Sequence, residues 1–131
     1  MKKIIYLMFL LTSAAYAQSG KPQVFTHMPS SFRDCDNRYY LSQNDKRAGR
    51  MIWVDNFKKG ILMINGHEEK LKSLKFPDKF KYGFWNKNYT VSIKITHQHS
   101  TPHVYSGTGL ITVYRGNRVI LSGKVLVAGG C

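Results

Sequence analysis

Three histidines near position 100 are the residues whose type and spacing could hold a metal ion. His97, His99 and His103 fall within residues 96–103. Two histidines separated by one residue share a face of an extended chain, and a third could reach back across a turn. Three imidazoles can bind zinc or copper. The competing interpretation is a polar loop between two strands, because no Asp or Glu lies nearby to orient the rings.

A second group combines cationic and aromatic side chains. Such a surface suits single-stranded nucleic acid or a sugar polymer, whose rings stack on aromatic side chains. The candidate residues for binding an anionic polymer are Lys70, Lys72, Lys75, Lys79, Lys81, Trp85 and Lys87. Simple alternation is the other interpretation, with Phe80, Tyr82 and Phe84 facing inward from a strand whose lysines face the solvent.

The acidic residues form no recognisable catalytic set. The chain has seven Asp and Glu residues, and the adjacent Glu68 and Glu69 would face opposite ways on a strand. The sequence contains no Gly-x-Ser-x-Gly elbow, phosphate-binding loop or His-Glu-x-x-His motif. No catalytic residue and no cofactor is therefore predicted, and a small secreted hydrolase is an alternative hypothesis only.

The first 17 residues have the pattern of a secretory signal peptide. Lys2 and Lys3 precede a short apolar run, and Ala15-Tyr16-Ala17 is a small-x-small cleavage site. The run is shorter than the roughly 20 residues that span a bilayer, which disfavours an uncleaved anchor. We therefore expect a periplasmic or secreted protein that begins at Gln18.

Export also gives the two cysteines, Cys35 and Cys131, an expected role. In an oxidising compartment a disulfide between them is the default expectation. It would close a loop of nearly the whole domain, which the chain-entropy model values at about 4 to 5 kcal/mol.

The net charge points to anionic partners. The whole chain carries +13, and loss of Lys2 and Lys3 with the signal peptide leaves +11. A surface of that charge attracts polyanions and repels basic proteins. In or beyond a bacterial envelope, the polyanions are lipopolysaccharide, acidic wall polymers, acidic polysaccharide and extracellular DNA.

The elements that must position these residues are predicted to be strands. Residues 89–96 alternate apolar and polar side chains, which is typical of a half-buried strand. Asn65-Gly66 and Gly116-Asn117 suit two-residue hairpin turns, where central residues adopt positive φ. A third turn is expected at residues 86–88, and short strands near residues 39–41 and 50–54.

This pattern predicts an all-β protein, an antiparallel meander of six to eight strands closed into a small barrel or a sandwich. No amphipathic helix is expected. The chain divides into a signal peptide (1–17), an irregular N-terminal arm (18–34) and a single β domain (35–131).

The last hairpin is partly apolar on both faces. With a two-residue turn, Leu110, Leu121 and Val125 share one face, and Ile111 and Leu126 share the other. Because a strand pair cannot leave two apolar faces in water, we expect the N-terminal arm or a partner to cover the second face.

Two segments carry a family resemblance. The hairpin at residues 59–66 and the ending from Tyr114-Arg115-Gly116-Asn117-Arg118 to Gly129-Gly130-Cys131 are similar to those of small exported β-proteins of the Bacteroidetes type. The resemblance implies export and a β fold, and nothing catalytic. A disulfide-closed exported barrel also resembles periplasmic lysozyme inhibitors, but a charge of +11 would repel lysozymes, which are usually basic.

The leading hypothesis is therefore a non-enzymatic exported binding module for an anionic envelope or extracellular partner. A metal-binding protein acting through the three histidines is the second hypothesis, and a small secreted hydrolase is the third.

Overall fold

Strands make up most of the protein. The computed structural model describes residues 20–29, 32, 36–75, 81–102 and 104–130. The described elements are β1 (Pro22–Gln23), β2 (Asp36–Tyr40), α2 (Gln43–Ala48), β3 (Trp53–Asp55), β4 (Lys59–Ile64), β5 (His67–Leu74), β6 (Lys81–Trp85), β7 (Tyr89–Ser100), β8 (Val104–Arg115) and β9 (Arg118–Gly130).

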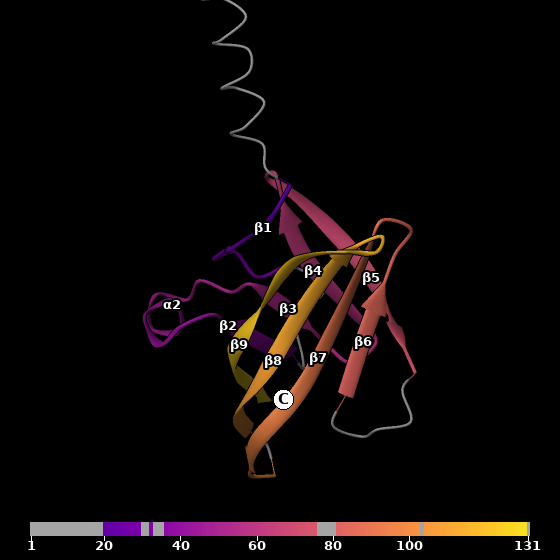
Figure 1. Cartoon of the computed structure of the whole chain (residues 1–131). Coiled ribbons are helices and arrows are strands. Elements are labelled where there is room, and N and C mark those ends of the chain that lie inside the picture. The colour runs from indigo at the N-terminus through magenta and orange to yellow at the C-terminus, as the bar shows by residue number, and fades with distance from the viewer. Residues whose placement is uncertain (1–19, 30–31, 33–35, 76–80, 103, 131) are drawn as a thin grey trace, which may run out of the picture.

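The sheet closes on itself. Each strand from β2 to β8 pairs antiparallel with the next one along the chain, and β9 pairs back with β2 (Figure 1). The result is an antiparallel barrel of eight strands, with β1 added beside β4. This confirms the all-β meander and selects the barrel over the sandwich. The interior of an eight-stranded barrel is just wide enough to be filled by side chains.

Alternation along the strands fills that interior. Tyr89, Val91, Ile93 and Ile95 are all buried in the core, as their spacing in the sequence predicts. The two-residue turns are also confirmed. Asn65 and Gly66 have φ of 50° and 77° between β4 and β5, and Gly116 has φ of 60° between β8 and β9.

The predicted faces of the last hairpin are wrong at β9. The register shifts between Val113 and Tyr114, so that β9 gains one residue. A one-residue shift moves the side chains that follow to the opposite face. Val125 therefore points inward with Ile111, whereas Leu110 is exposed on the outside.

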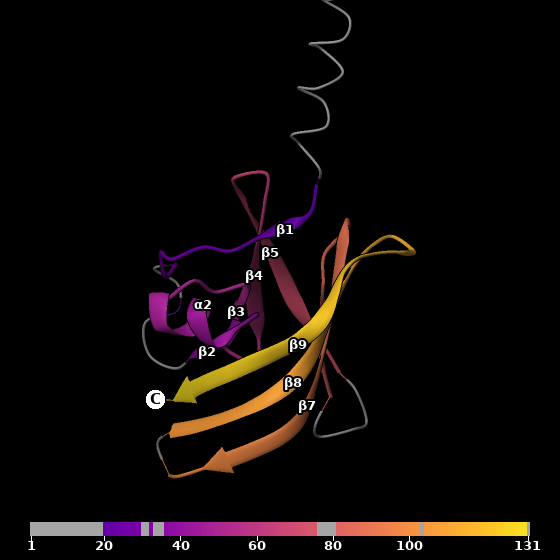
Figure 2. The same ribbon diagram turned by 60° about the vertical axis from the view of Figure 1, so that its left-hand side comes forward.

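The N-terminal arm covers one outer side of the barrel. Phe25 exchanges two backbone hydrogen bonds of 2.8 Å with Met51. With Phe32 it buries the outward residues of β2, β3 and β4 in a second core, and β9 borders this core. Figure 2 shows the arm crossing beside these strands, while β7, β8 and β9 curve away from it. The arm was one of the two covers expected for the second apolar face of the last hairpin. It covers β2–β4 and, of the last hairpin, the edge of β9 only.

Helix α2 is short and was not foreseen. None of its six residues is buried, so no apolar stripe reveals it in the sequence. Its signals are the ends: the Ser42 side chain accepts a hydrogen bond from the backbone N of Asp45, and Gly49 ends the helix with φ of 70°. No helix in the described ranges is long and apolar enough to cross a membrane.

Candidate anion-binding surface

The lysine–aromatic group is divided between the two sides of the barrel wall. On β6, Phe84 is buried and Tyr82 half-buried, while Lys81 and Trp85 are exposed. The alternation expected for a strand is therefore present. The other described candidates, Lys70, Lys72, Lys75 and Lys87, are all exposed, and Lys79 lies outside the described residues.

Three of the outward residues form a row across the strands. Lys59 on β4 lies directly opposite Lys72 on β5, and Lys72 lies opposite Trp85 on β6. Directly opposed side chains are in contact range, with Cβ atoms about 5 Å apart. Trp85 is 47% exposed. The row therefore presents two cations beside an accessible aromatic ring, as the binding hypothesis requires.

A second row lies on the outer side of the next strands. Lys81 on β6 faces Lys94 on β7, Lys94 faces Leu110 on β8, and Leu110 faces Lys124 on β9. All four side chains are exposed. The sequence prediction missed Lys94 and Lys124, because it sought lysines next to aromatic residues. Strand pairing, which joins residues far apart in the chain, brings them together.

The acidic residues are distributed unevenly. The sequence contains no Asp or Glu after Asp78, so β6 to β9 carry cations only. Among the described residues, the two ion pairs are Arg38–Asp36 at 3.0 Å and Arg50–Asp45 at 2.8 Å, both outside these strands. We call the outward side chains of β6–β9 the cationic face. Its potential is positive, because these strands contribute no carboxylate.

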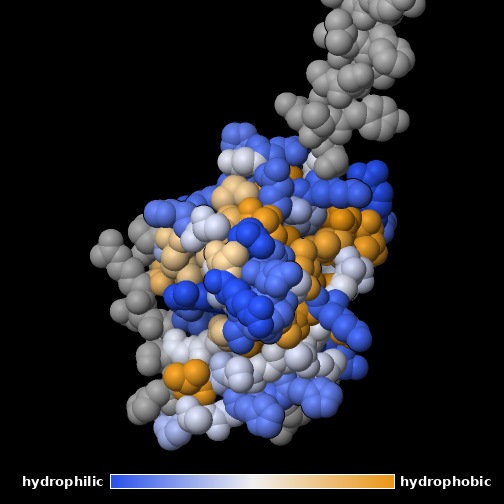
Figure 3. Space-filling view, turned by 90° about the vertical axis from the view of Figure 1, so that its left-hand side faces the viewer, coloured by the Kyte–Doolittle hydropathy of each residue, from blue (hydrophilic) through white to orange (hydrophobic). Residues whose placement is uncertain are grey.

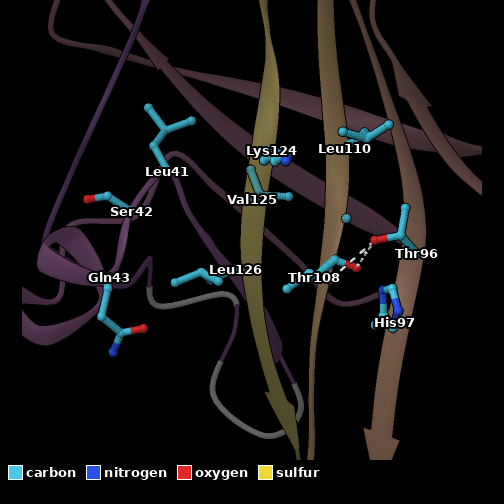
Figure 4. A pocket seen from close by; sticks show the side chains of 11 residues that line it. Leu41, Ser42, Gln43, Thr96, His97, Thr108, Leu110, Lys124, Val125 and Leu126 are labelled. Carbon is cyan, nitrogen blue, oxygen red and sulfur yellow. Dashed lines mark hydrogen bonds between the residues drawn. The ribbon is translucent and has the colours of Figure 1, made fainter.

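A groove adjoins the cationic face where β9 approaches the start of α2. It has a volume of about 630 Å³. Its floor is the outer side of β7, β8 and β9, and residues 41–43 form one wall (Figure 4). Leu41, Leu110 and Leu126 make it mainly apolar. Among the described residues that line the groove, Lys124 is the single Lys or Arg and none is acidic.

The histidines lie on a strand and not in a loop. Strand β7 continues to Ser100, so His97 and His99 pair with Thr108 and Ser106 of β8. The loop interpretation is therefore wrong for these two residues. Both are exposed, and His103 lies outside the described residues. Within the described part of the chain, no three His, Cys, Asp or Glu side chains are close enough to hold a metal ion.

One carboxylate is buried inside the barrel. Asp55 accepts hydrogen bonds from Asn37 Nδ2 at 2.8 Å, from Trp53 Nε1 at 2.8 Å and from the backbone N of Phe57 at 3.2 Å. Tyr39 also hydrogen-bonds to it. Burial raises the pKa of Asp55, and these hydrogen bonds lower it in part. Its acceptor capacity is used within the fold, so Asp55 has a structural role.

The same burial acts on the tyrosines around Asp55. Desolvation raises the pKa of Tyr39, Tyr82 and Tyr105, and the negative charge of Asp55 raises each one further. Tyr105 donates a hydrogen bond to Asn37, which extends the buried network across the barrel. The sequence offered one signal for this network: Trp53 and Asp55 are two residues apart, so they share a strand face.

Cys35 and Cys131 lie outside the described residues. Their sequence neighbours, Asp36 and Gly130, are directly paired between β2 and β9.

Comparison of the chain with protein-family models, curated proteins and solved structures finds no match. The function of the chain is therefore inferred from its surface.

Proposed function

We propose that this protein is a non-enzymatic exported binding module whose cationic face engages an anionic partner. The observation that supports it is the absence of Asp and Glu after Asp78, which leaves half of the barrel wall with cations only. The partner is an anionic component of the envelope or the extracellular space: lipopolysaccharide, a wall polymer, a polysaccharide or extracellular DNA.

The arrangement of the lysines supports the proposal physically. Like charges directly opposite each other destabilise a sheet, yet Lys59 on β4 faces Lys72 on β5, next to the cationic face. An anion lying over this pair removes the repulsion and releases its own counterions. Trp85, at the end of the first row, adds a surface on which a sugar or base ring can stack.

A comparison of two double variants on a heparin column tests the proposal. Lys94→Gln with Lys124→Gln neutralises the cationic face. Lys46→Gln with Arg47→Gln removes the same charge from α2. We expect the first variant to elute at clearly lower salt than the second, because only it removes contacts with the polyanion. Equal elution of the two variants would exclude the cationic face as the binding surface.

Metal binding through His97 and His99 is a second candidate, because both side chains lie two residues apart on β7 and are exposed. Titration with zinc or copper should then show near-stoichiometric uptake that His97→Ala with His99→Ala abolishes. Absence of uptake at micromolar metal would exclude this candidate.

A further inference from the structure

The groove beside the cationic face combines an apolar floor with a charged border. Leu110 is 43% exposed at its floor, and Leu41, in the opposite wall, is 37% exposed. Figure 3, which faces the side that carries α2, shows hydrophilic surface at the centre with hydrophobic surface next to it. A volume of about 630 Å³ lies within the range of about 300–1,000 Å³ found for small-molecule sites.

Two lysines flank this apolar floor. Leu110 lies directly between Lys94 on β7 and Lys124 on β9. Neighbouring strands are about 4.8 Å apart, so both ammonium groups can reach a single head group above Leu110. Thr96 and Thr108 lie in the same groove with their hydroxyls 3.2 Å apart (Figure 4). The Thr96 hydroxyl donates to the backbone O of Thr108 at 3.1 Å, so the Thr108 hydroxyl is the one that can donate to the head group.

The remainder of the cationic face differs from the groove. Between its two rows, Ser92, Thr112 and Ser122 are directly opposed on β7, β8 and β9. These small polar side chains offer nothing to insert into a bilayer. Trp85, Val104 and Val119 are also exposed on these strands, but they lie outside the groove. The groove gathers Leu41, Leu110 and Leu126 around a hollow of about 630 Å³, which favours one bound molecule over the surface of a membrane.

We propose that the groove binds a lipid that presents one alkyl chain and a phosphate head group. The chain lies along Leu41, Leu110 and Leu126, and the phosphate lies between Lys94 and Lys124. The lipid proposal rests on the proposed function, and it narrows the anionic partner of the protein to an amphiphile. A purely hydrophilic polymer would leave the apolar floor of the groove uncovered.

Calorimetric titration of the purified, exported protein with dodecyl phosphate, below the concentration at which it forms micelles, tests the proposal. One ligand per protein is the expected result. Methyl phosphate has the head without the chain, and dodecyltrimethylammonium has the chain with the opposite charge. Both should bind at least about tenfold more weakly, because each loses one of the two interactions.

Two matched substitutions locate the site. Leu110→Gln removes the apolar floor, and Leu74→Gln changes an outward leucine of β5 that is 38% exposed and lies outside the groove. We expect Leu110→Gln to weaken dodecyl phosphate binding about tenfold and Leu74→Gln to leave it unchanged. Equal effects of the two substitutions, or equal affinity for the two dodecyl ligands, would overturn the proposal.

The heparin column separates this proposal from the proposed function. Leu110→Gln should be retained on heparin like the unsubstituted protein, since it changes no charge. If the unsubstituted protein binds heparin but not dodecyl phosphate, the lipid proposal fails and the anion-binding module stands. If it binds neither, both proposals fail.

Discussion

Two outer faces of the same barrel have opposite chemistry. On β2–β4, the outward residues Tyr40, Val54 and Ile61 are buried beneath the N-terminal arm. On β6–β9, the outward residues Lys94, Leu110 and Lys124 are exposed. Both faces belong to one sheet and share one interior. The difference shows that outward side chains decide whether a barrel wall is covered by its own chain or stays exposed.

The two faces meet where β2 pairs with β9. The largest predicted change in stability concerns this strand pair. Asp36 faces Gly130 there, which favours a disulfide between the adjacent Cys35 and Cys131. Cys35→Ser with Cys131→Ser should lower the free energy of unfolding by about 4 kcal/mol. Urea denaturation measures this loss. Dithiothreitol should destabilise only the unsubstituted protein, and equal stability with and without reductant would contradict the disulfide.

The covered face should depend on its arm. Phe25→Ala should lower the free energy of unfolding by about 3 kcal/mol, because it opens a cavity beneath the arm. Leu110→Ala on the open face should change it by about 0.5 kcal/mol or less, since that side chain is already exposed. Thermal or urea denaturation of both variants measures the contrast. Similar losses would show that the open face is covered in solution.

The stability of the barrel should depend on pH through Asp55, which lies in the interior beneath both faces. Asp55→Asn should cost about 2 kcal/mol at neutral pH, because an amide cannot accept at both former oxygen positions. Burial raises the pKa of Asp55 in the folded state. Between the unfolded and the folded pKa, only the folded protein holds the proton, so the contribution of Asp55 to stability falls as pH rises through this window.

Denaturation of the unsubstituted protein and of Asp55→Asn from pH 4 to pH 7 isolates that contribution. The stability advantage of the unsubstituted protein should be largest at the acidic end and should decrease toward neutral pH. An advantage that increases with pH would show that the hydrogen bonds to Asp55 outweigh its burial.

The local pattern predicted the inward half of this molecule well. Residues 89–95 alternate without a fault, and Asn65-Gly66 specifies its turn through positive φ, so both could be read from neighbouring residues. The bulge in β9 was not visible, because an extra residue in a strand leaves no mark in an apolar run. Because of the bulge, Leu121 and Val125 both point into the barrel, and not outward with Leu110.

The candidate site was less accessible to sequence reasoning, because it depends on strand pairing. The lysines between residues 70 and 87 could be found from their aromatic neighbours. Lys94 and Lys124 are 30 residues apart in the sequence, and strand pairing places one on each side of Leu110. The distribution of acids was the available signal: the absence of Asp and Glu after Asp78 marks the half of the barrel that becomes the cationic face.

The smallest predicted effect is the most specific to the open face, because stability and binding should change in opposite directions. Lys94→Gln and Lys124→Gln should each raise the free energy of unfolding slightly, by up to about 0.5 kcal/mol at low salt, because each removes a cation from strands that carry no Asp or Glu. Both substitutions should lower the salt needed for elution from heparin. A loss of stability in Lys94→Gln would show that Lys94 supports the fold. It would contradict the assignment of Lys94 to a binding surface.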